Sequence, residues 1–265
     1  MALKMETLDF IHVGKTGGTS LLELLKNQIN IENIYHLDKY SRKEKLTYIH
    51  NPEKFMKNKW ITIVRDPLDR FISAFNIFKF ANNANRNTMA YYSNLEHPLI
   101  ERKKMSWYDV KEIKSFDTVN DLLEALTDNP DSETYKAAHF LMKHEHLGSG
   151  FHRFLRHNPR EQWLYNNINS CYYVAVLEDP LWQHKLCKKL NIIGQTKEIH
   201  LKRGISGPKP YLSEKARINF YNYHKYKDYR IIGELAGYNL ISKNTYLKYI
   251  QNVLQITDEQ AKLFD

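Results

Sequence analysis

Two short segments carry the residue types from which α/β proteins build phosphate-binding turns. The first, from Phe10 to Ser20, reads FIHVGKTGGTS, and the second, from Trp60 to Phe75, reads WITIVRDPLDRFISAF. In each, an apolar strand stops abruptly and continues into a helix through a turn that carries a cation, hydroxyls or glycine, and helix N-termini attract anions. Two anion sites on neighbouring strands indicate one ligand with two phosphate groups.

The first turn combines glycines, a lysine and hydroxyl side chains. Glycine lets the main chain turn tightly and approach an anion, so that successive N–H groups point inward. Lys15 adds a full charge, and the following helix adds a partial positive charge. The candidate anion-binding residues are Lys15, Thr16, Gly17, Gly18, Thr19 and Ser20. A glycine-rich turn without a ligand is the alternative.

The order of the first motif differs from that of a nucleoside triphosphatase P-loop. That P-loop reads G-x-x-x-x-G-K-[ST], with the lysine directly after the last glycine. Here Lys15 precedes the pair Gly17-Gly18. This order counts against an enzyme that depends on ATP or GTP.

In the second turn the candidates are Arg65 and Ser73. A guanidinium binds phosphate oxygens through two parallel hydrogen bonds, and Ser73 is expected about one turn into the following helix. The alternative is a local salt bridge between Arg65 and Asp66, worth under ~1 kcal/mol at a surface. Asp69 and Arg70 are expected to support the turn rather than to contact the ligand.

Composition favours one globular domain with anionic partners. No Pro/Gly/Ser-rich linker divides the 265 residues, 42% of which are hydrophobic, so we expect a single domain over residues 1–265. The formal net charge of +9 favours a nucleotide, an acidic glycan or nucleic acid, but a solvated lysine-rich surface has the same composition.

Compartment and membrane association follow from the cysteines and the apolar runs. Cys171 and Cys187 form no CxxC pattern, which favours a reducing compartment. A strand expected near residue 8 leaves no room for a signal peptide, and no apolar run reaches ~18 residues. We therefore expect a cytoplasmic protein with no membrane partner.

Hydrophobic periodicity predicts strands alternating with helices, then a helical remainder. Strands are expected at residues 8–13, 33–37, 47–50, 60–64 and 171–177. Helices are expected at 18–27, from residue 68, at 119–127 and 132–146, and after start signals at Ser213, Ser242 and Thr257. Residues 79–114 are expected to form an insertion or acceptor-side loop. The pattern predicts a three-layer, P-loop-like α/β fold with a central parallel sheet of about four to five strands and a helical C-terminal part.

Together the two motifs resemble those of sulfotransferases that use 3′-phosphoadenosine 5′-phosphosulfate (PAPS), in particular the branch with glycan and heparan-sulfate 2-O-sulfotransferase-like enzymes. Residues 15–20, KTGGTS, are similar to that family's 5′-phosphosulfate loop, and residues 65–73, RDPLDRFIS, to its R-D-P-x-x-R-x-x-S segment. The resemblance is tight over residues 8–78 and looser at 173–190 and 200–228. It does not extend to residues 79–170.

The resemblance implies a role for each matching residue. Lys15 would neutralise charge on the oxygen that joins sulfate to the 5′-phosphate. Arg65 and Ser73 would bind the 3′-phosphate. The 5′-phosphate would be bound by Gly17, Gly18, Thr19 and Ser20. Lys202 and Arg203 precede a flexible turn that resembles a basic loop closing over the cofactor, although a plain solvated turn fits equally well.

The implied reaction moves a sulfuryl group from PAPS to a hydroxyl or amine of a glycan or small molecule, leaving 3′-phosphoadenosine 5′-phosphate (PAP). A histidine is expected as the proton acceptor, because histidine titrates near neutral pH. The resembling enzymes often place a catalytic histidine shortly before the strand that leads into R-D-P, which implies His50, fifteen residues before Arg65, with His36 as second choice. No metal cofactor is expected, since lysine, backbone amides and a helix N-terminus meet the developing charge. The histidines at 139–152 lack the H-E-x-x-H spacing of a metal site.

Two other functions compete with this one. A P-loop-type kinase is disfavoured by the position of Lys15. A non-catalytic basic module that binds acidic polysaccharide or nucleic acid leaves the two separate anion turns unexplained. We therefore expect a small-molecule or glycan acceptor and no nucleic-acid partner. The sequence selects neither the acceptor nor an oligomeric state.

Overall fold

The chain forms an α/β fold around a parallel sheet. The computed structural model describes residues 7–25, 29–35, 58–83, 110–144, 147–148, 150–152, 168–192 and 209–264. Within them, four parallel strands lie in the order β2-β1-β3-β4. The strands are β1 (Thr7–Ile11), β2 (Asn30–Tyr35), β3 (Lys59–Val64) and β4 (Cys171–Val176). The α/β class and the parallel sheet predicted from the sequence are confirmed, while the strand expected at 47–50 lies outside the described residues.

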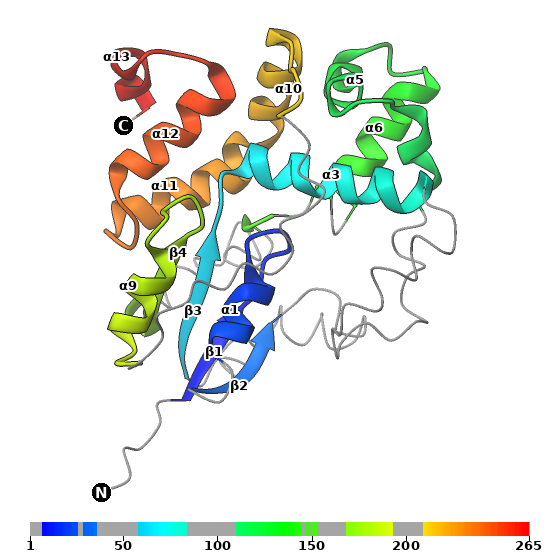
Figure 1. The fold of residues 1–265 in the computed structure, drawn as a ribbon. Coiled ribbons are helices and arrows are strands. Elements are labelled where there is room, and N and C mark those ends of the chain that lie inside the picture. The colour runs from blue at the N-terminus through cyan, green and yellow to red at the C-terminus, as the bar shows by residue number, and fades with distance from the viewer. Residues whose placement is uncertain are drawn as a thin grey trace, which may run out of the picture.

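Helices cover both faces of the sheet, because the central strands are apolar on both sides. Along β3, Ile61 and Ile63 pack against α1 (Gly18–Leu25) and α9 (Trp182–Lys189). Trp60 and Val64 face the opposite way and join the larger core. Figure 1 shows α1 and α9 beside the sheet, while the residues of its other face are buried in the larger core.

The larger core holds the helical part of the chain. Figure 1 shows α3 crossing beyond the carboxyl end of β3, with the C-terminal helices and α5 and α6 around it. These elements are α3 (Pro67–Asn83), η4 (Lys111–Ser115), α5 (Val119–Glu124), η5 (Ala125–Thr127), α6 (Glu133–Lys143), η6 (Ile168–Ser170), α10 (Glu214–His224), the π-helix η7 (Lys225–Tyr229), α11 (Arg230–Gly237), α12 (Lys243–Leu254), α13 (Asp258–Ala261) and η8 (Lys262–Phe264). Of the helices that the structure describes, none has the length and apolar character to cross a membrane.

Residues 79–114, expected as a loop, are helical at both described ends. The helix α3 continues through Asn83, and Lys111–Ser115 form η4, in which Ile113 is buried. The helix that starts near residue 68 thus continues beyond residue 79. Residues 84–109 lie outside the described residues.

The strand order creates a switch point between β1 and β3. From β1 the chain moves to β2 on one side, and β3 then pairs with β1 on the other. Ligands of open α/β sheets bind at the carboxyl ends of the strands where the order reverses in this way. The two candidate turns follow β1 and β3, so both lie at this point.

Local start signals correctly predict three C-terminal helices. Ser213, Ser242 and Thr257 are the N-caps of α10, α12 and α13, and each side-chain oxygen accepts a backbone N–H three residues on. Thr257 and Gln260 also form the predicted capping box.

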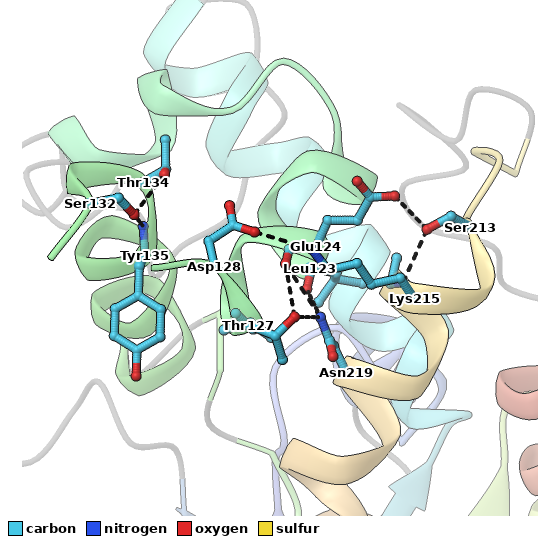
Figure 2. Close-up of polar contacts among 12 residues, drawn as sticks. Leu123, Glu124, Thr127, Asp128, Ser132, Thr134, Tyr135, Ser213, Lys215 and Asn219 are labelled. Atoms are coloured by element: carbon cyan, nitrogen blue, oxygen red, sulfur yellow. Dashed lines mark hydrogen bonds and ion pairs between the residues drawn. The ribbon is translucent and has the colours of Figure 1, made fainter. Parts of the chain in front are cut away.

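A polar network joins α10 to α5 and η5 (Figure 2). Ser213 Oγ donates to Glu124 Oε1 at 2.5 Å. The buried Asn219 amide donates to Leu123 O at 2.9 Å and to Thr127 Oγ1 at 3.0 Å. Side chains of α10 and its N-cap thus bond to polar groups of α5 and η5, including a carbonyl at the end of α5. These bonds fix the position of α10 against α5 and η5.

We predict that Asn219→Ala lowers the free energy of unfolding by about 1–3 kcal/mol, because buried acceptors lose their donor. Urea unfolding followed by circular dichroism should show a lower midpoint with an unchanged slope. The control is Asn244→Ala, an exposed asparagine in α12, which should move the midpoint little. Equal effects of the two substitutions would contradict the role of the network.

Candidate functional site

The turn after β1 has the backbone shape of an anion-binding concavity. Lys15 and Gly17 both have positive φ angles, 69° and 83°, on either side of Thr16. A left-handed conformation costs a non-glycine residue roughly 1–2 kcal/mol, so the strained Lys15 is held by its surroundings. Thr16 provides part of that support, because its fully buried hydroxyl donates to Val13 O at 2.7 Å. The Thr16 hydroxyl therefore braces the turn instead of facing a ligand, which leaves its backbone amide for that role.

Two of the three glycines pack closely against neighbouring side chains. A Cβ on Gly17 would lie 2.8 Å from Leu177 Cδ1, and one on Gly18 would lie 2.1 Å from the His12 ring. A Cβ on Gly14 would meet nothing within 4 Å. Gly17 and Gly18 therefore let the start of α1 sit directly against the end of β4 and His12.

The N-terminus of α1 faces into this turn with its partial positive charge intact. Its first internal bond runs from Leu21 N to Gly17 O at 3.1 Å, and its first turn contains no acidic residue. Thr19 belongs to that first turn, and Ser20 is 8% exposed. An anion placed here would meet main-chain N–H groups and the dipole of α1.

The turn after β3 is joined directly to the first turn. Arg65 Nη1 donates to Lys15 O at 3.1 Å. One layer below, Thr62 Oγ1 donates to Ile11 O at 2.9 Å, where β1 and β3 pair. The structure thus brings the two predicted turns side by side.

The charge of Arg65 is not neutralised by a neighbouring carboxylate. Among the described residues its guanidinium forms no ion pair, and Asp66 makes its bonds elsewhere. The alternative of a local Arg65–Asp66 salt bridge is therefore wrong. A partly exposed guanidinium held by a neutral carbonyl keeps its full charge for an anion.

Ser73 lies further along α3 than expected. Counted from Pro67 as the first residue, Ser73 is the seventh and lies nearly two turns into the helix, not one. It is partly exposed, whereas Ala74 and Phe75 beside it are buried. Ser73 thus lies on the open side of α3, four residues beyond Asp69 and on the same face.

Asp66 caps α3 and so occupies the N-terminus of that helix. Its Oδ1 accepts from Leu68 N at 2.8 Å and from Asp69 N at 3.4 Å. An anion at this end of the site therefore meets the Arg65 and Ser73 side chains rather than the amides of α3. The two halves of the site are built differently, with main chain in one and side chains in the other.

Three residues that bond Asp66 or its partners were missed by sequence reasoning as parts of the site. Glu178 Oε1, just after β4, accepts from Asp66 N at 3.0 Å. Asn252 Nδ2 donates to Asp66 Oδ2 at 2.8 Å, and Tyr249 OH donates to Glu178 Oε2 at 2.6 Å. No local pattern connects Asn252 or Tyr249 with residue 66, so no sequence signal identified them.

Arg70 points into the core, as expected of a supporting residue. It is 1% exposed, and its Nη2 donates to Leu147 O at 3.0 Å. Burial lowers its pKa, while the fully buried Asp228 raises it. The ring of His152 in turn lies 2.7 Å from Asp228 Oδ1. Arg70 and Asp228 are thus two buried charged groups that interact electrostatically.

The predicted residues His36, His50, Lys202 and Arg203 lie outside the described residues. Of the histidines near residue 145, His139 packs on Tyr135 and His144 on Phe78. Within the described part of the chain, no group of three or more His, Cys, Asp or Glu residues is arranged to hold a metal ion.

Asp66 makes stability depend on pH. Burial, with the neighbouring Asp69 and Glu178 carboxylates, raises its pKa from 3.8 to about 7. Between those values the folded protein binds more protons than the unfolded chain, so the stability contribution of Asp66 falls as pH rises. We predict that Asp66→Asn abolishes this loss, because asparagine also caps helices and carries no charge.

The expected gain of Asp66→Asn over wild type grows from pH 4 to pH 7 and levels off above, reaching at most about 4 kcal/mol. Urea unfolding at a series of pH values measures it. Asp131→Asn, at an exposed carboxylate, is the control. Parallel pH curves for wild type and Asp66→Asn would contradict this account of the buried carboxyl.

Comparison with known proteins identifies the family. Neither the curated proteins nor the solved structures gave a significant match to the chain. A family model described as the sulfotransferase family matches residues 5–188, which include both turns, the sheet and Glu178. Since that match covers more than half of the sequence, the chain belongs to the sulfotransferase family.

Proposed function

We propose that this protein transfers a sulfuryl group from PAPS to a hydroxyl, or an amine, of a glycan or small-molecule acceptor. The observation that carries the proposal is the bond from Arg65 Nη1 to Lys15 O, which joins the two candidate turns at the switch point of the sheet. A ligand with phosphate groups at both ends of a nucleoside matches such a site. Membership of the sulfotransferase family supports sulfuryl transfer in general.

The 5′ end of the donor would bind in the turn after β1. The main-chain N–H groups of Gly17, Gly18, Thr19 and Ser20 would hold the 5′-phosphate with the help of the α1 dipole. Lys15 would neutralise charge on the oxygen between sulfur and phosphorus as that bond breaks. A preorganised cation at this position stabilises the transition state more than the ground state.

The 3′-phosphate would bind at the turn after β3. Arg65 supplies a charge that no described carboxylate neutralises, and Ser73 supplies a hydroxyl from the open side of α3. The 3′ end is thus recognised by side chains, and the presence of this second phosphate distinguishes the donor from a nucleoside triphosphate. Lys202 and Arg203 would close over the bound donor.

The chemical step is an in-line displacement at sulfur. The acceptor oxygen forms a bond to sulfur, the bond from sulfur to the 5′-phosphate oxygen breaks, and PAP leaves with the electron pair. His50, or as second choice His36, would take the acceptor's proton. We assign no metal to the step, because Lys15 and the amides at the start of α1 meet the charge that develops on the phosphate.

The donor is tested by isothermal titration calorimetry. We predict that PAP binds with micromolar or tighter affinity and that ATP, which lacks a 3′-phosphate, binds at least about tenfold more weakly. Arg65→Ala should weaken PAP with little effect on AMP. Micromolar binding of ATP without binding of PAP would overturn the assignment and favour a nucleotide kinase.

The proton acceptor is tested separately from donor binding. We predict that His50→Ala leaves the affinity for PAP near that of wild type but lowers transfer of radiolabelled sulfate from PAPS by about 10²–10⁴-fold, the usual contribution of general base catalysis. The acceptor panel would contain glycans, phenols and guanidino compounds, and His36→Ala, assayed in parallel, tests the second choice for the base. Retained turnover in His50→Ala would remove His50 from this role.

A further inference from the structure

We propose that Tyr249 and Asn252 of α12 are positioning residues for the donor's 3′-phosphate, acting through Asp66 on Arg65. This inference rests on the proposed function, since it assigns the turn after β3 to that phosphate. Both residues lie beyond residue 188, where the family match ends. They would therefore be a property of this chain's C-terminal part.

The contacts form a closed ring around Asp66. The backbone N–H of Asp66 donates to Glu178 Oε1 at 3.0 Å, and Tyr249 OH donates to Glu178 Oε2 at 2.6 Å. Asn252 Nδ2 donates to Asp66 Oδ2 at 2.8 Å. Both the main chain and the side chain of Asp66 are thus tied, directly or through Glu178, to the same helix.

Helix geometry explains why α12 holds both positions. Tyr249 and Asn252 are three residues apart, so they lie on one face of the helix, one turn from each other. Tyr249 is 4% exposed, and Ile250 and Val253 pack the same helix into the core. The hydrogen-bonding groups are therefore carried on a helix with little freedom to move.

The ring acts where it can change anion binding. Asp66 directly follows Arg65, so the backbone at Asp66 sets the direction in which the Arg65 side chain leaves the turn. The far end of Arg65 is fixed by its bond to Lys15 O at 3.1 Å. Because α12 also fixes Asp66 at the other end, the Arg65 guanidinium is preorganised for a phosphate. Preorganisation raises affinity by lowering the entropy lost on binding.

A neighbouring pair limits the charge around the ring. The Asn252 amide also lies 3.5 Å from Asp69 Oδ1, and Lys209 Nζ lies 3.1 Å from that oxygen. If Asn252 is removed, Asp66 Oδ2 loses its amide partner while Asp69 and Glu178 remain nearby. Movement of Asp66 toward solvent then becomes more favourable, because it separates the Asp66 carboxylate from the other two, and Arg65 moves with it.

The test compares two ligands that differ by the 3′-phosphate. PAP and AMP are titrated by calorimetry into the full chain carrying Asn252→Ala or Tyr249→Phe. The second substitution removes the hydroxyl group and keeps the aromatic side chain. We expect about tenfold weaker binding of PAP and unchanged binding of AMP, whereas a general loss of structure would weaken both. In an Arg65→Ala background, Asn252→Ala should cause no further loss, because the ring acts through Arg65.

Matched controls on the same helix are Asn244→Ala and Tyr246→Phe, which should leave both affinities unchanged. If wild type binds PAP but Asn252→Ala and Tyr249→Phe bind it equally well, this inference is overturned and the proposed function stands. Equal weakening of PAP and AMP also overturns it. If wild type binds no PAP, the proposed function fails, and this inference fails with it.

Discussion

The hydrogen bond from Arg65 to the Lys15 carbonyl is the interaction on which the site depends. At 3.1 Å it joins two turns that are fifty residues apart in sequence and adjacent in the sheet. The parallel pairing of Ile11 with Thr62 fixes the spacing just below it. Because the acceptor is a neutral carbonyl, the bond positions the guanidinium without neutralising it. The turns are thus held at a fixed separation, which a ligand with two anionic ends requires.

The two halves of the proposed site would recognise anions by different means. In the first half, the alternating backbone of Lys15 and Gly17 and the start of α1 present main-chain amides. In the second half, Asp66 accepts the N–H groups of Leu68 and Asp69, so an anion bound there would depend on the charge of Arg65. Main-chain N–H groups bind any phosphate of suitable size, whereas a positioned arginine side chain strengthens binding only of a ligand that has a second phosphate. Under the proposed function, this division would let the site at the switch point select a 3′-phosphorylated nucleotide.

Sequence reasoning succeeded where the information is local. The strands around both turns and the caps at Ser213, Ser242 and Thr257 follow from neighbouring residues, and the structure has them. It failed where a contact joins distant residues. Asn252 reaches Asp66 across 186 positions. Polar side chains have several possible partners of equal chemistry, and only the packing of α12 on the turn selects one of them.

Carboxylates beside a phosphate site demand an explanation, because like charges repel a ligand. Each of those near Arg65 has a partner that limits this effect. Lys209 pairs with Asp69, and Tyr249 donates to Glu178. Asp66 accepts hydrogen bonds from two N–H groups of α3 and from the Asn252 amide. Burial raises its pKa to about 7, so the carboxyl group is partly protonated at neutral pH. None of the three is bonded to Arg65, so the acidic groups fix the turn without pairing with the guanidinium that we propose binds the ligand.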